Sequence, residues 1–427
     1  ILAQAISPEG IKGIMVRISL VAQCTKNPDT QEKSVNQYTL LREIGRGTYC
    51  KVKWALDDEG AGYAVKALSR ATLASKQVSL FQREGVQTVP LQTRVDLELR
   101  ILSEHPHPHI VGLVEVIDDP AHDRLYIILE GMEGGQLMEW STDHSAYGVS
   151  SKPSEVQQRL WGDRVRHGAP EAGVLVYQEA VASEVLRQLL RAVAHLHERG
   201  VVHKDLKPDN VLLAMPAPTA DPRFVRPMPP APGAAAAGAG CPAADGAAPG
   251  AGGEDVREVL RGGGFVAKVA DFNTAVVCEP PDCRIWDAEG TQQFTPPECF
   301  DPCRDTAVGI LGQPRDVWSL GCVLFTMLFG RCPFWEEEPI RLQLALMHFA
   351  MDANAAVDVP SGAVSQHAED IIRQLLHKDP ARRPAAAAAP RRACWTRWAA
   401  ASPRRAPPRR APPCKPASSS RGPPVVV

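Results

Sequence analysis

Charged side chains that could do chemistry are concentrated in the stretch from His203 to Asn210, which reads His-Lys-Asp-Leu-Lys-Pro-Asp-Asn. A second acidic motif, Asp271-Phe272-Asn273, follows the apolar run from Phe265 to Ala270. The N-terminal part has a glycine-containing stretch at residues 44–52, Ile-Gly-Arg-Gly-Thr-Tyr-Cys-Lys-Val. Glycine lets the backbone approach a phosphate group closely and present N–H donors to it. Together the three stretches indicate chemistry on phosphate groups by side chains from distant parts of the chain.

Patterns of apolar residues predict the elements that would hold these motifs in place. Tyr38 to Leu41 is an apolar run directly before the glycine-containing stretch, and Ala64 to Lys66 lies in a β-prone run after it. Val95 to Leu102 has apolar residues at helical spacing, and the segment from Val181 to His197 is amphipathic. We therefore expect a strand around Lys66, a helix that carries Glu98 and a helix before the acidic stretch.

The order and spacing of these motifs resemble those of the eukaryotic serine/threonine protein kinases. Further motifs carry the resemblance: Gly290 to Glu298 resembles the end of the activation segment, Asp316 to Gly321 the buried helix that anchors the larger lobe, and Asp379 to Pro384 the late arginine motif. Taken singly, Lys66 could be a solvated lysine and Asp271 a turn former. Independent turns and surface charges, however, have no reason to reproduce the whole set in this order.

The resemblance implies a role for each residue. Asp205 would accept the proton of the substrate hydroxyl, and Lys66, paired with Glu98, would hold the α- and β-phosphates of ATP. Lys207 would contact the γ-phosphate and Thr291 would bridge Asp205 and Lys207, which is typical of kinases that act on serine and threonine. The residues expected to bind ATP are Ile44, Gly45, Gly47, Val52, Ala64, Lys66, Glu130, Met132, Asn210 and Asp271. The residues expected to bind Mg²⁺ are Asn210 and Asp271.

The resemblance also implies an α+β, bilobal protein-kinase fold. Residues 38–131 would form a small β-rich N-lobe with one main helix, and residues 132–384 a larger, mostly helical C-lobe in which Glu298 pairs with Arg383. A chain of 427 residues with 44% hydrophobic content can bury a core of this size. Residues 1–37 are expected to be an N-terminal extension, and residues 385–427 a basic low-complexity tail.

Three segments are longer than this fold usually needs. The first is Gln77 to Thr93, before the helix that carries Glu98. The second, Ser141 to Leu175, follows a short helix expected at Gln136 to Trp140. The third, Met215 to Gly264, is dominated by alanine, proline and glycine, which cannot bury enough apolar surface to offset the entropy of ordering. We expect the third segment to be a disordered surface excursion without a catalytic role.

Within the kinases, the chain resembles the calcium/calmodulin-dependent protein kinase kinases and related upstream kinases of AMP-activated kinase. Four stretches carry this likeness: Gln37 to Leu41, His107 to Pro120, Leu137 to Trp140 and Phe329 to Phe334. The likeness implies a protein substrate that is itself a kinase, with calmodulin as a candidate partner. Trp395 and Trp398 lie among arginines, as in a calmodulin-binding helix, but Pro390 and Pro403 leave room for only about three turns. Composition favours a disordered basic tail.

Three substitutions depart from the family pattern. Cys50 stands for the third glycine of the loop, where its small side chain should fit. Asn273 stands for the glycine of the metal-binding motif, where asparagine tolerates a left-handed backbone. Lys204 replaces the arginine that binds a phosphate on the activation segment, and lysine offers a point charge where arginine offers a fork. Activity is therefore expected not to depend on phosphorylation of this segment, whose remaining acceptors are Thr274 and Thr295.

Two functions of different class are open. The first is an active kinase that uses ATP and Mg²⁺ to phosphorylate serine or threonine in proteins. The second is a pseudokinase scaffold, in which the changed glycine loop and metal-binding motif leave the cleft inert. The retained set of catalytic residues favours the first function: Lys66, Glu98, Asp205, Asn210 and Asp271.

Composition argues against several other classes of protein. The net charge of −2 and the isoelectric point near 6.7 favour neither nucleic acid nor a membrane surface as a partner. No two of the eleven cysteines form a C-x-x-C pair, so neither a cysteine-based metal framework nor a disulfide framework is expected. No apolar run has the length of a membrane span and the start does not resemble a signal peptide, so we expect a cytoplasmic protein, with the nucleus as an alternative. The absence of an initiating Met suggests a fragment or a processed product.

Overall fold

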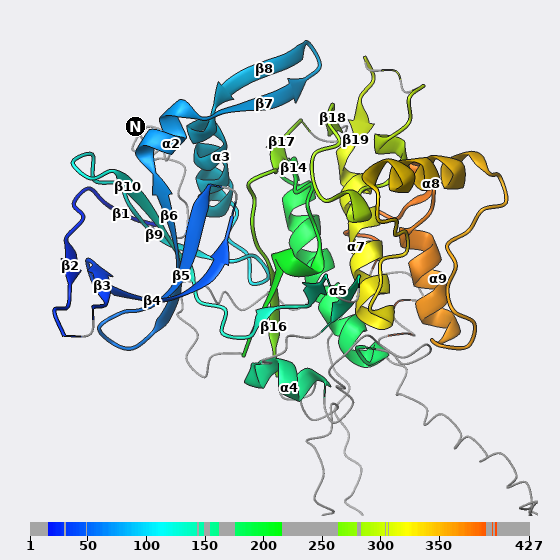
Figure 1. The fold of residues 1–427 in the computed structure, drawn as a ribbon. Helices are drawn as coiled ribbons and strands as arrows, with labels where there is room; N and C mark the ends of the chain where they lie inside the picture. Colours follow the sequence, from blue (N-terminus) through cyan, green and yellow to red (C-terminus); the bar gives the residue numbers. More distant parts are fainter. Residues whose placement is uncertain are drawn as a thin grey trace, which may run out of the picture.

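The computed structural model describes residues 16–29, 31–47, 49–142, 145–148, 154–161, 176–215, 264–279, 283–303, 305, 307–389, 395 and 398 (Figure 1). A curled sheet with two helices forms one lobe, and a group of helices forms the other (Figure 1). The predicted α+β, bilobal fold is confirmed. In this part of the chain no helix is both long and apolar enough to cross a membrane.

The first lobe is built on an eight-stranded sheet with the strand order β1-β9-β10-β6-β5-β4-β3-β2. The strands are β1 (Arg17–Ser19), β2 (Cys24–Lys26), β3 (Lys33–Val35), β4 (Tyr38–Arg46), β5 (Cys50–Leu56), β6 (Gly62–Ser69), β9 (Leu113–Ile117) and β10 (Arg124–Glu130). All neighbours are antiparallel except β1 and β9. Val35, Tyr38, Val65 and Ile128 pack on one buried face. The sheet begins before residue 38, because β1 to β3 lie in the segment predicted as an extension.

The first of the three long segments forms a hairpin and the first residues of a helix. The elements here are α2 (Arg70–Ser75), β7 (Gln77–Gln82), β8 (Gly85–Pro90) and α3 (Leu91–Glu104). β7 and β8 pair in a separate two-stranded sheet. α3 buries Leu91, Val95, Leu99 and Leu102, whose spacing is that of one helix face. The helix predicted around Glu98 is confirmed, and it is longer than the pattern indicated.

The second lobe is organised around one almost fully buried helix. Its helices are α4 (Glu155–Trp161), α5 (Glu179–His197), α7 (Gly312–Phe329), α8 (Pro339–Met351) and α9 (Gln366–Leu375). α7 is apolar around most of its circumference, which is typical of a core helix, and α5 and α9 pack against it. A Cβ atom at Gly321 would approach Leu375 and Leu376 to 2.8 Å, so glycine permits this close packing.

Short strands connect the helices of the second lobe. In a three-stranded sheet, β15 (Val211–Ala214) lies between β11 (Gly135–Gln136) and β16 (Val266–Val269). The other strands form three two-stranded sheets: β12 (Glu139–Ser141) with β13 (Ala146–Gly148), β14 (Val201–Val202) with β17 (Val276–Val277), and β18 (Arg284–Ile285) with β19 (Ile310–Leu311).

The short helix predicted at Gln136 to Trp140 is wrong, because β11 and β12 occupy this segment. Gly135, the first residue of β11, has a left-handed backbone (φ 71°), which turns the chain at this point and is not compatible with a helix. Trp140 of β12 packs on Tyr147 of β13, with ring centroids 5.1 Å apart. An aromatic cross-strand pair of this kind stabilises a hairpin.

The start of the predicted basic tail packs on the second lobe. Ala386, Ala389, Trp395 and Trp398 are buried in the main hydrophobic core, and the indole N–H of Trp398 donates to Glu179 Oε2 at 2.8 Å. The expectation of a disordered tail from residue 385 is therefore wrong for these residues. The arginine-rich composition indicated solvation, but each indole ring buries a large apolar area. Residues 390–394, 396–397 and 399–427 lie outside the described part.

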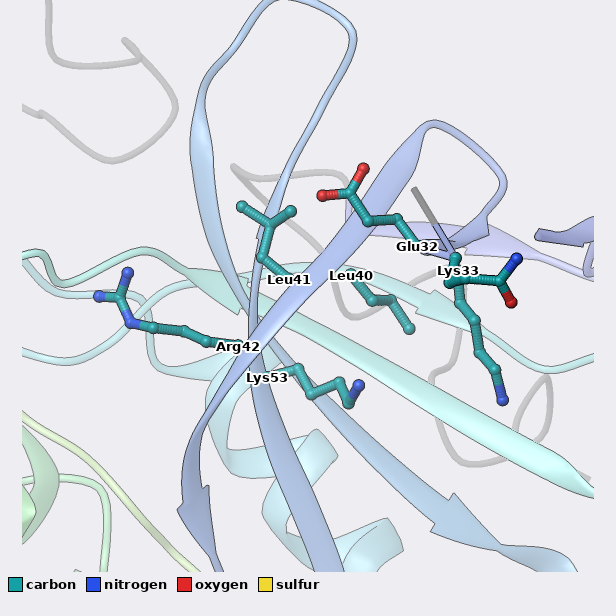
Figure 2. Close-up of a pocket in the computed structure, with 7 residues that line it drawn as sticks. Glu32, Lys33, Leu40, Leu41, Arg42 and Lys53 are labelled. Carbon is teal, nitrogen blue, oxygen red and sulfur yellow. The ribbon is translucent and has the colours of Figure 1, made fainter. Parts of the chain in front are cut away.

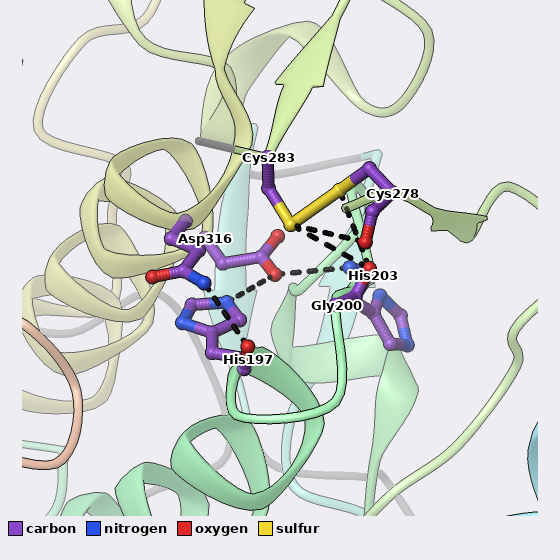
Figure 3. The surroundings of a disulfide bond; sticks show 7 residues. His197, Gly200, His203, Cys278, Cys283 and Asp316 are labelled. Atoms are coloured by element: carbon purple, nitrogen blue, oxygen red, sulfur yellow. Dashed lines mark hydrogen bonds and ion pairs between the residues drawn. A yellow bond between two sulfur atoms is a disulfide. The ribbon is translucent and has the colours of Figure 1, made fainter. Parts of the chain in front are cut away.

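One disulfide corrects the expectation drawn from cysteine spacing. Cys278 and Cys283 are bonded, with their Cα atoms 5.1 Å apart, and they connect the segment after β17 to the start of β18 (Figure 3). Their sulfur atoms lie 3.3 and 3.6 Å from the carbonyl oxygen of Gly200, just before β14. Sequence could not show this pair, because nothing in a separation of five residues distinguishes bonded from free cysteines.

A shallow pocket of about 390 Å³ lies on the first lobe, beside β3, β4 and β5 (Figure 2). Its lining residues are Gln31, Glu32, Lys33, Leu40, Leu41, Arg42 and Lys53. Charged groups of both signs line it, and none of the residues predicted to bind ATP contributes to it. The chemistry indicated by the sequence therefore lies elsewhere.

Candidate active site

The stretch from His203 to Asn210 is held by a buried carboxylate of α7. Asp316 accepts a hydrogen bond from the backbone N–H of His203 at 2.9 Å and lies 2.9 Å from Nε2 of His197 (Figure 3). It also accepts a hydrogen bond from the backbone N–H of Lys204 at 3.0 Å. Burial alone would raise the pKa of Asp316, but His197 and the N–H of His203 bring that pKa below its usual value. Lys204 has a left-handed backbone (φ 69°), a strained conformation that persists only where its surroundings fix it.

Three of the predicted site residues meet around the carboxylate of a fourth, Asp205. The backbone N–H of Thr291 donates to Asp205 Oδ1 at 2.8 Å. Lys207 Nζ lies 3.0 Å from Asp205 Oδ2 and donates to Thr291 Oγ1 at 2.8 Å. Asn210 Nδ2 donates to Asp205 Oδ2 at 3.1 Å. Burial alone would raise the pKa of Asp205, but Lys207 and Thr291 outweigh burial and hold this pKa below its usual value. The site therefore offers an ionised proton acceptor beside an ammonium group.

The predicted pair between Lys66 and Glu98 is present. Lys66 Nζ, on β6, donates to Glu98 Oε1 of α3 at 2.6 Å and lies 3.3 Å from Asp271 Oδ1. Burial alone would lower the pKa of Lys66, but the two carboxylates outweigh burial and raise it. The ammonium group therefore stays charged, and it joins the sheet, α3 and the acidic motif after β16. A fixed positive charge in this position can hold phosphate oxygens.

The motif from Asp271 to Asn273 forms a turn after β16. Phe272 is buried against the ring of His203, with 4.8 Å between ring centroids. The left-handed backbone expected at Asn273 is wrong, because Asp271 is the residue with positive φ (65°). The pairing with Lys66 and the burial of Phe272 fix the turn at Asp271. Asn273 contributes a side-chain hydrogen bond, from Nδ2 to Asp271 Oδ2 at 3.3 Å.

The glycine-containing stretch is the hairpin between β4 and β5. Gly45 faces Val52 across the hairpin, and the N–H of Gly47 donates to the carbonyl of Cys50 at 3.0 Å. Val52 in turn lies opposite Lys66 in the register of β5 and β6. A Cβ atom at Gly47 would lie 3.2 Å from Cys50 Sγ, so the thiol occupies space inside the turn. Burial raises the pKa of this thiol. Thr48 lies outside the described part.

The other residues predicted to bind ATP lie on β4, on β6, at the last residue of β10 and just after β10. Ile44 is exposed, Ala64 is half-buried and Met132 is buried. The carboxylate of Glu130 accepts hydrogen bonds from Lys268 Nζ at 2.6 and 2.7 Å. The side chain of Glu130 is therefore engaged by Lys268.

Asn210 and Asp271 have the chemistry of Mg²⁺ ligands. The side chain of Asp271 is 36% exposed, and Asn210 uses its amide NH₂ group on Asp205, which keeps its amide oxygen for a cation. Mg²⁺ prefers oxygen ligands in octahedral geometry and usually keeps several waters. Within the described residues, no group of three or more His, Cys, Asp and Glu could hold a metal ion. Phosphate and water oxygens would therefore complete the coordination.

The predicted pair at the end of the activation segment is also present. Arg383 Nη1 and Nη2 donate to Glu298 Oε1 and Oε2 at 2.6 and 2.8 Å, a two-pronged geometry that only arginine offers. The guanidinium group of Arg383 also lies 4.9 Å from the centre of the Trp318 ring on α7. The segment that contains Thr291 is thereby anchored to the second lobe beyond the active site.

Sequence reasoning missed three residues beside the site. Lys204 Nζ lies between the carboxylates of Asp287 and Glu289, and Glu289 also binds Arg94 of α3. None of the three belongs to a recognised motif. The available signal was the pair of acidic residues directly before Gly290, in the segment expected to reach Lys204.

Comparisons with known proteins agree with this geometry. A model of the protein kinase domain matches residues 38–220 and 256–394. A calcium/calmodulin-dependent protein kinase kinase of Caenorhabditis elegans is 27% identical over 361 aligned residues, and the match covers 82% of this chain and 50% of that protein.

Two further relatives are described as serine/threonine-protein kinases. They are ssp1 of Schizosaccharomyces pombe, 24% identical over 82% of this chain and 41% of its own length, and GRIK2 of Arabidopsis thaliana, 26% identical over 82% and 63%. The chain spans about half the length of the curated relatives that it matches.

Proposed function

Since the chain belongs to the protein kinase family, we propose that it transfers the γ-phosphoryl group of ATP to serine or threonine hydroxyls of proteins. The observation that carries the proposal is the assembly around Asp205, in which Lys207 and Thr291 contact one ionised carboxylate. The relatives described as serine/threonine-protein kinases support the choice of hydroxyl.

In this reaction each charged residue has a separate task. Asp205 accepts the proton of the substrate hydroxyl as that oxygen bonds to the γ-phosphorus, and the bond from that phosphorus to the β,γ-bridging oxygen breaks to release ADP. Lys207 contacts the γ-phosphate, and Lys66, oriented by Glu98, contacts the α- and β-phosphates. Mg²⁺ held by Asn210 and Asp271 would neutralise phosphate charge. Rate enhancement then comes from positioning and charge stabilisation, since the protein forms no covalent bond to the substrate.

A finer part of the proposal concerns the substrate and the partner. We infer that the substrate is itself a protein kinase, which the description of the Caenorhabditis elegans relative supports. Calmodulin is a candidate partner on the same ground. Trp395 and Trp398 add no support, because both are buried and an anchor for calmodulin must be exposed.

The pseudokinase alternative has weaker support. Cys50 and Asn273 depart from the family pattern, yet Lys66 still contacts both Glu98 and Asp271. A scaffold would need neither contact.

Radiolabelled ATP distinguishes the two functions. The purified chain is incubated with Mg²⁺ and two peptide pools, one with serine and threonine and one with tyrosine as the only acceptor. We expect label in the first pool alone, and loss of this label when EDTA removes the metal. Label in the tyrosine pool alone would contradict the substrate class. No transfer from a chain that binds ATP would favour the scaffold.

Removal of the alanine- and proline-rich excursion should preserve activity. Ala214 of β15 lies opposite Val266 of β16, so the chain leaves and re-enters the hairpin at neighbouring positions. A turn of two to five residues is enough to connect such strands. We expect a variant in which a short glycine-containing turn replaces residues 216–263 to keep its turnover within about twofold, roughly 0.4 kcal/mol. Loss of soluble protein or of ATP turnover would show that this segment, which lies outside the described residues, is structural.

A further inference from the structure

Lys204 is a buried cation with two acidic partners from the activation segment, the stretch between Asn273 and Glu298. Its side chain is 2% exposed, and its Nζ donates to both carboxylate oxygens of Asp287 at 2.9 Å and to Glu289 Oε2 at 3.3 Å. A buried charge is tolerated only when it is paired and hydrogen-bonded. Because Lys204 directly precedes Asp205, this pairing fixes the start of the stretch from His203 to Asn210, called the catalytic loop below.

Glu289 also reaches the first lobe. Arg94 Nη1, on α3, donates to Glu289 Oε1 at 2.5 Å, and Arg94 Nη2 donates to the carbonyl of Ser79 on β7. Arg94 precedes Glu98 by four residues, so the two side chains lie on the same face of α3. The carboxylate of Glu289 therefore has two contacts: one with Arg94 on α3, the helix that orients Lys66, and one with Lys204, the residue next to Asp205.

The backbone between Glu289 and Thr291 connects the contact between Glu289 and Arg94 to the active site. Gly290 has a φ of 125°, and a Cβ atom there would lie 2.5 Å from the carbonyl oxygen of Lys204. The fully buried Arg315 donates to the carbonyl oxygens of both Glu289 and Lys204. Thr291, which follows Gly290 in the chain, donates its backbone N–H to Asp205. The place of Glu289 thus sets the place of Thr291.

Three cations face two carboxylates at this point, which leaves one positive charge in excess. Three cations, Arg94, Lys204 and Arg315, surround the carboxylates of Asp287 and Glu289; Arg315 Nη1 lies 3.8 Å from Asp287 Oδ1. A phosphate group adds a charge of about −1.5 to −2 at neutral pH. A phosphate beside Asp287 and Glu289 would be repelled by their two carboxylates, and it would not find two cations that lack an acidic partner.

We propose that Asp287 and Glu289 are positioning residues for catalysis, which hold α3, the activation segment and the catalytic loop in the productive arrangement without a phosphate. Arg94, Lys204, Asp287 and Glu289 are called the four-residue clamp below. The clamp acts on the transition state by placing Lys66 and Asp205, and it does not itself touch ATP. The activity readout of this inference rests on the proposed function.

The test compares Glu289→Gln and Arg94→Gln with Glu337→Gln, a matched change at an exposed glutamate before α8. For the first two variants we expect kcat to fall about tenfold or more, roughly 1.4 kcal/mol, while the dissociation constant of ATP changes less than about threefold. The double variant should be no slower than Glu289→Gln, because residues in one contact are not additive. Lys204→Arg keeps the charge and should retain most of the rate.

Hydrogen exchange supplies a second readout that needs no activity. In Glu289→Gln and in Arg94→Gln, amide exchange should rise both in residues 287–295 and in the first half of α3, although the substitution lies in only one of them. A variant that merely unfolds would exchange faster throughout, including α7. Arg94→Gln keeps the test usable if Glu289→Gln does not fold, because Arg94 lies outside the second lobe.

Phosphatase treatment of the wild-type chain completes the test, with removal of phosphate verified by mass. We expect the rate to stay within about tenfold, and a larger drop would overturn the proposal, because the segment would then need its phosphate. Equal kcat and equal exchange in Glu289→Gln and Glu337→Gln would also overturn it. If the wild-type chain transfers no phosphate but exchange still couples α3 to residues 287–295, the proposed function fails and the clamp stands.

Discussion

Asp205→Asn is expected to reduce phosphoryl transfer to background, a loss of about 10³-fold or more in kcat, roughly 4 kcal/mol. Asparagine has the same shape as aspartate and keeps an oxygen for the N–H of Thr291, which now donates to Asp205 Oδ1 at 2.8 Å. It loses the charge that Lys207 stabilises and the ability to accept a proton. ATP affinity should remain nearly intact, because Asp205 serves the substrate hydroxyl.

The measurement is kcat on a serine/threonine peptide together with ATP binding by calorimetry. Asp301→Asn is the matched control, because Asp301 is an exposed aspartate of the same lobe, away from the site. Turnover like that of wild type in Asp205→Asn would remove Asp205 from its role as base. The pKa of Asp205 lies below its usual value, so a fall in rate between pH 7 and about pH 5 could not be assigned to its protonation.

Lys66→Met is the second large effect. Methionine preserves much of the length of the side chain but removes the ammonium group that lies 2.6 Å from Glu98 and 3.3 Å from Asp271. We expect kcat/KM to fall about 10²–10³-fold, because the phosphates lose a fixed positive charge and two carboxylates then face each other. The change also leaves Glu98 buried without its partner, which costs about 3–5 kcal/mol of stability.

A double variant separates the two consequences of this change. Lys66→Met with Glu98→Gln removes the unpaired buried carboxylate, so the melting temperature should recover while activity stays lost. Lys26→Met is the control, since Lys26 is an exposed lysine on β2 of the same sheet and lies outside the glycine-containing stretch. Full activity of Lys66→Met at normal stability would show that the first lobe has been misread.

The active-site residues that lie close together in the sequence were the easiest to predict. Asp205, Lys207 and Asn210 are within six residues of one another, so the spacing of one loop already brings them together. The helix around Glu98 was also predictable, because its apolar spacing of three and four residues survives in the buried face of α3.

The segments predicted wrongly are those in which packing outweighed local pattern. Trp140 was read as part of a helix, but it is held in β12 by its contact with Tyr147 across the hairpin. Trp395 and Trp398 were assigned to a solvated tail from the arginines around them. Their rings instead fill space in the core of the second lobe, and Trp398 donates a hydrogen bond to Glu179.

The sequence by itself determined the family, the two lobes and the identity of the groups that handle phosphate, because these depend on residue type and spacing along the chain. Only the tertiary structure decided the partners of Lys204. Asp287 and Glu289 follow it by more than eighty residues, and Arg94 precedes it by more than one hundred. Contacts across such distances leave no periodic pattern in the chain. They arise because a buried lysine must be neutralised by whichever carboxylates the folded segment brings to it.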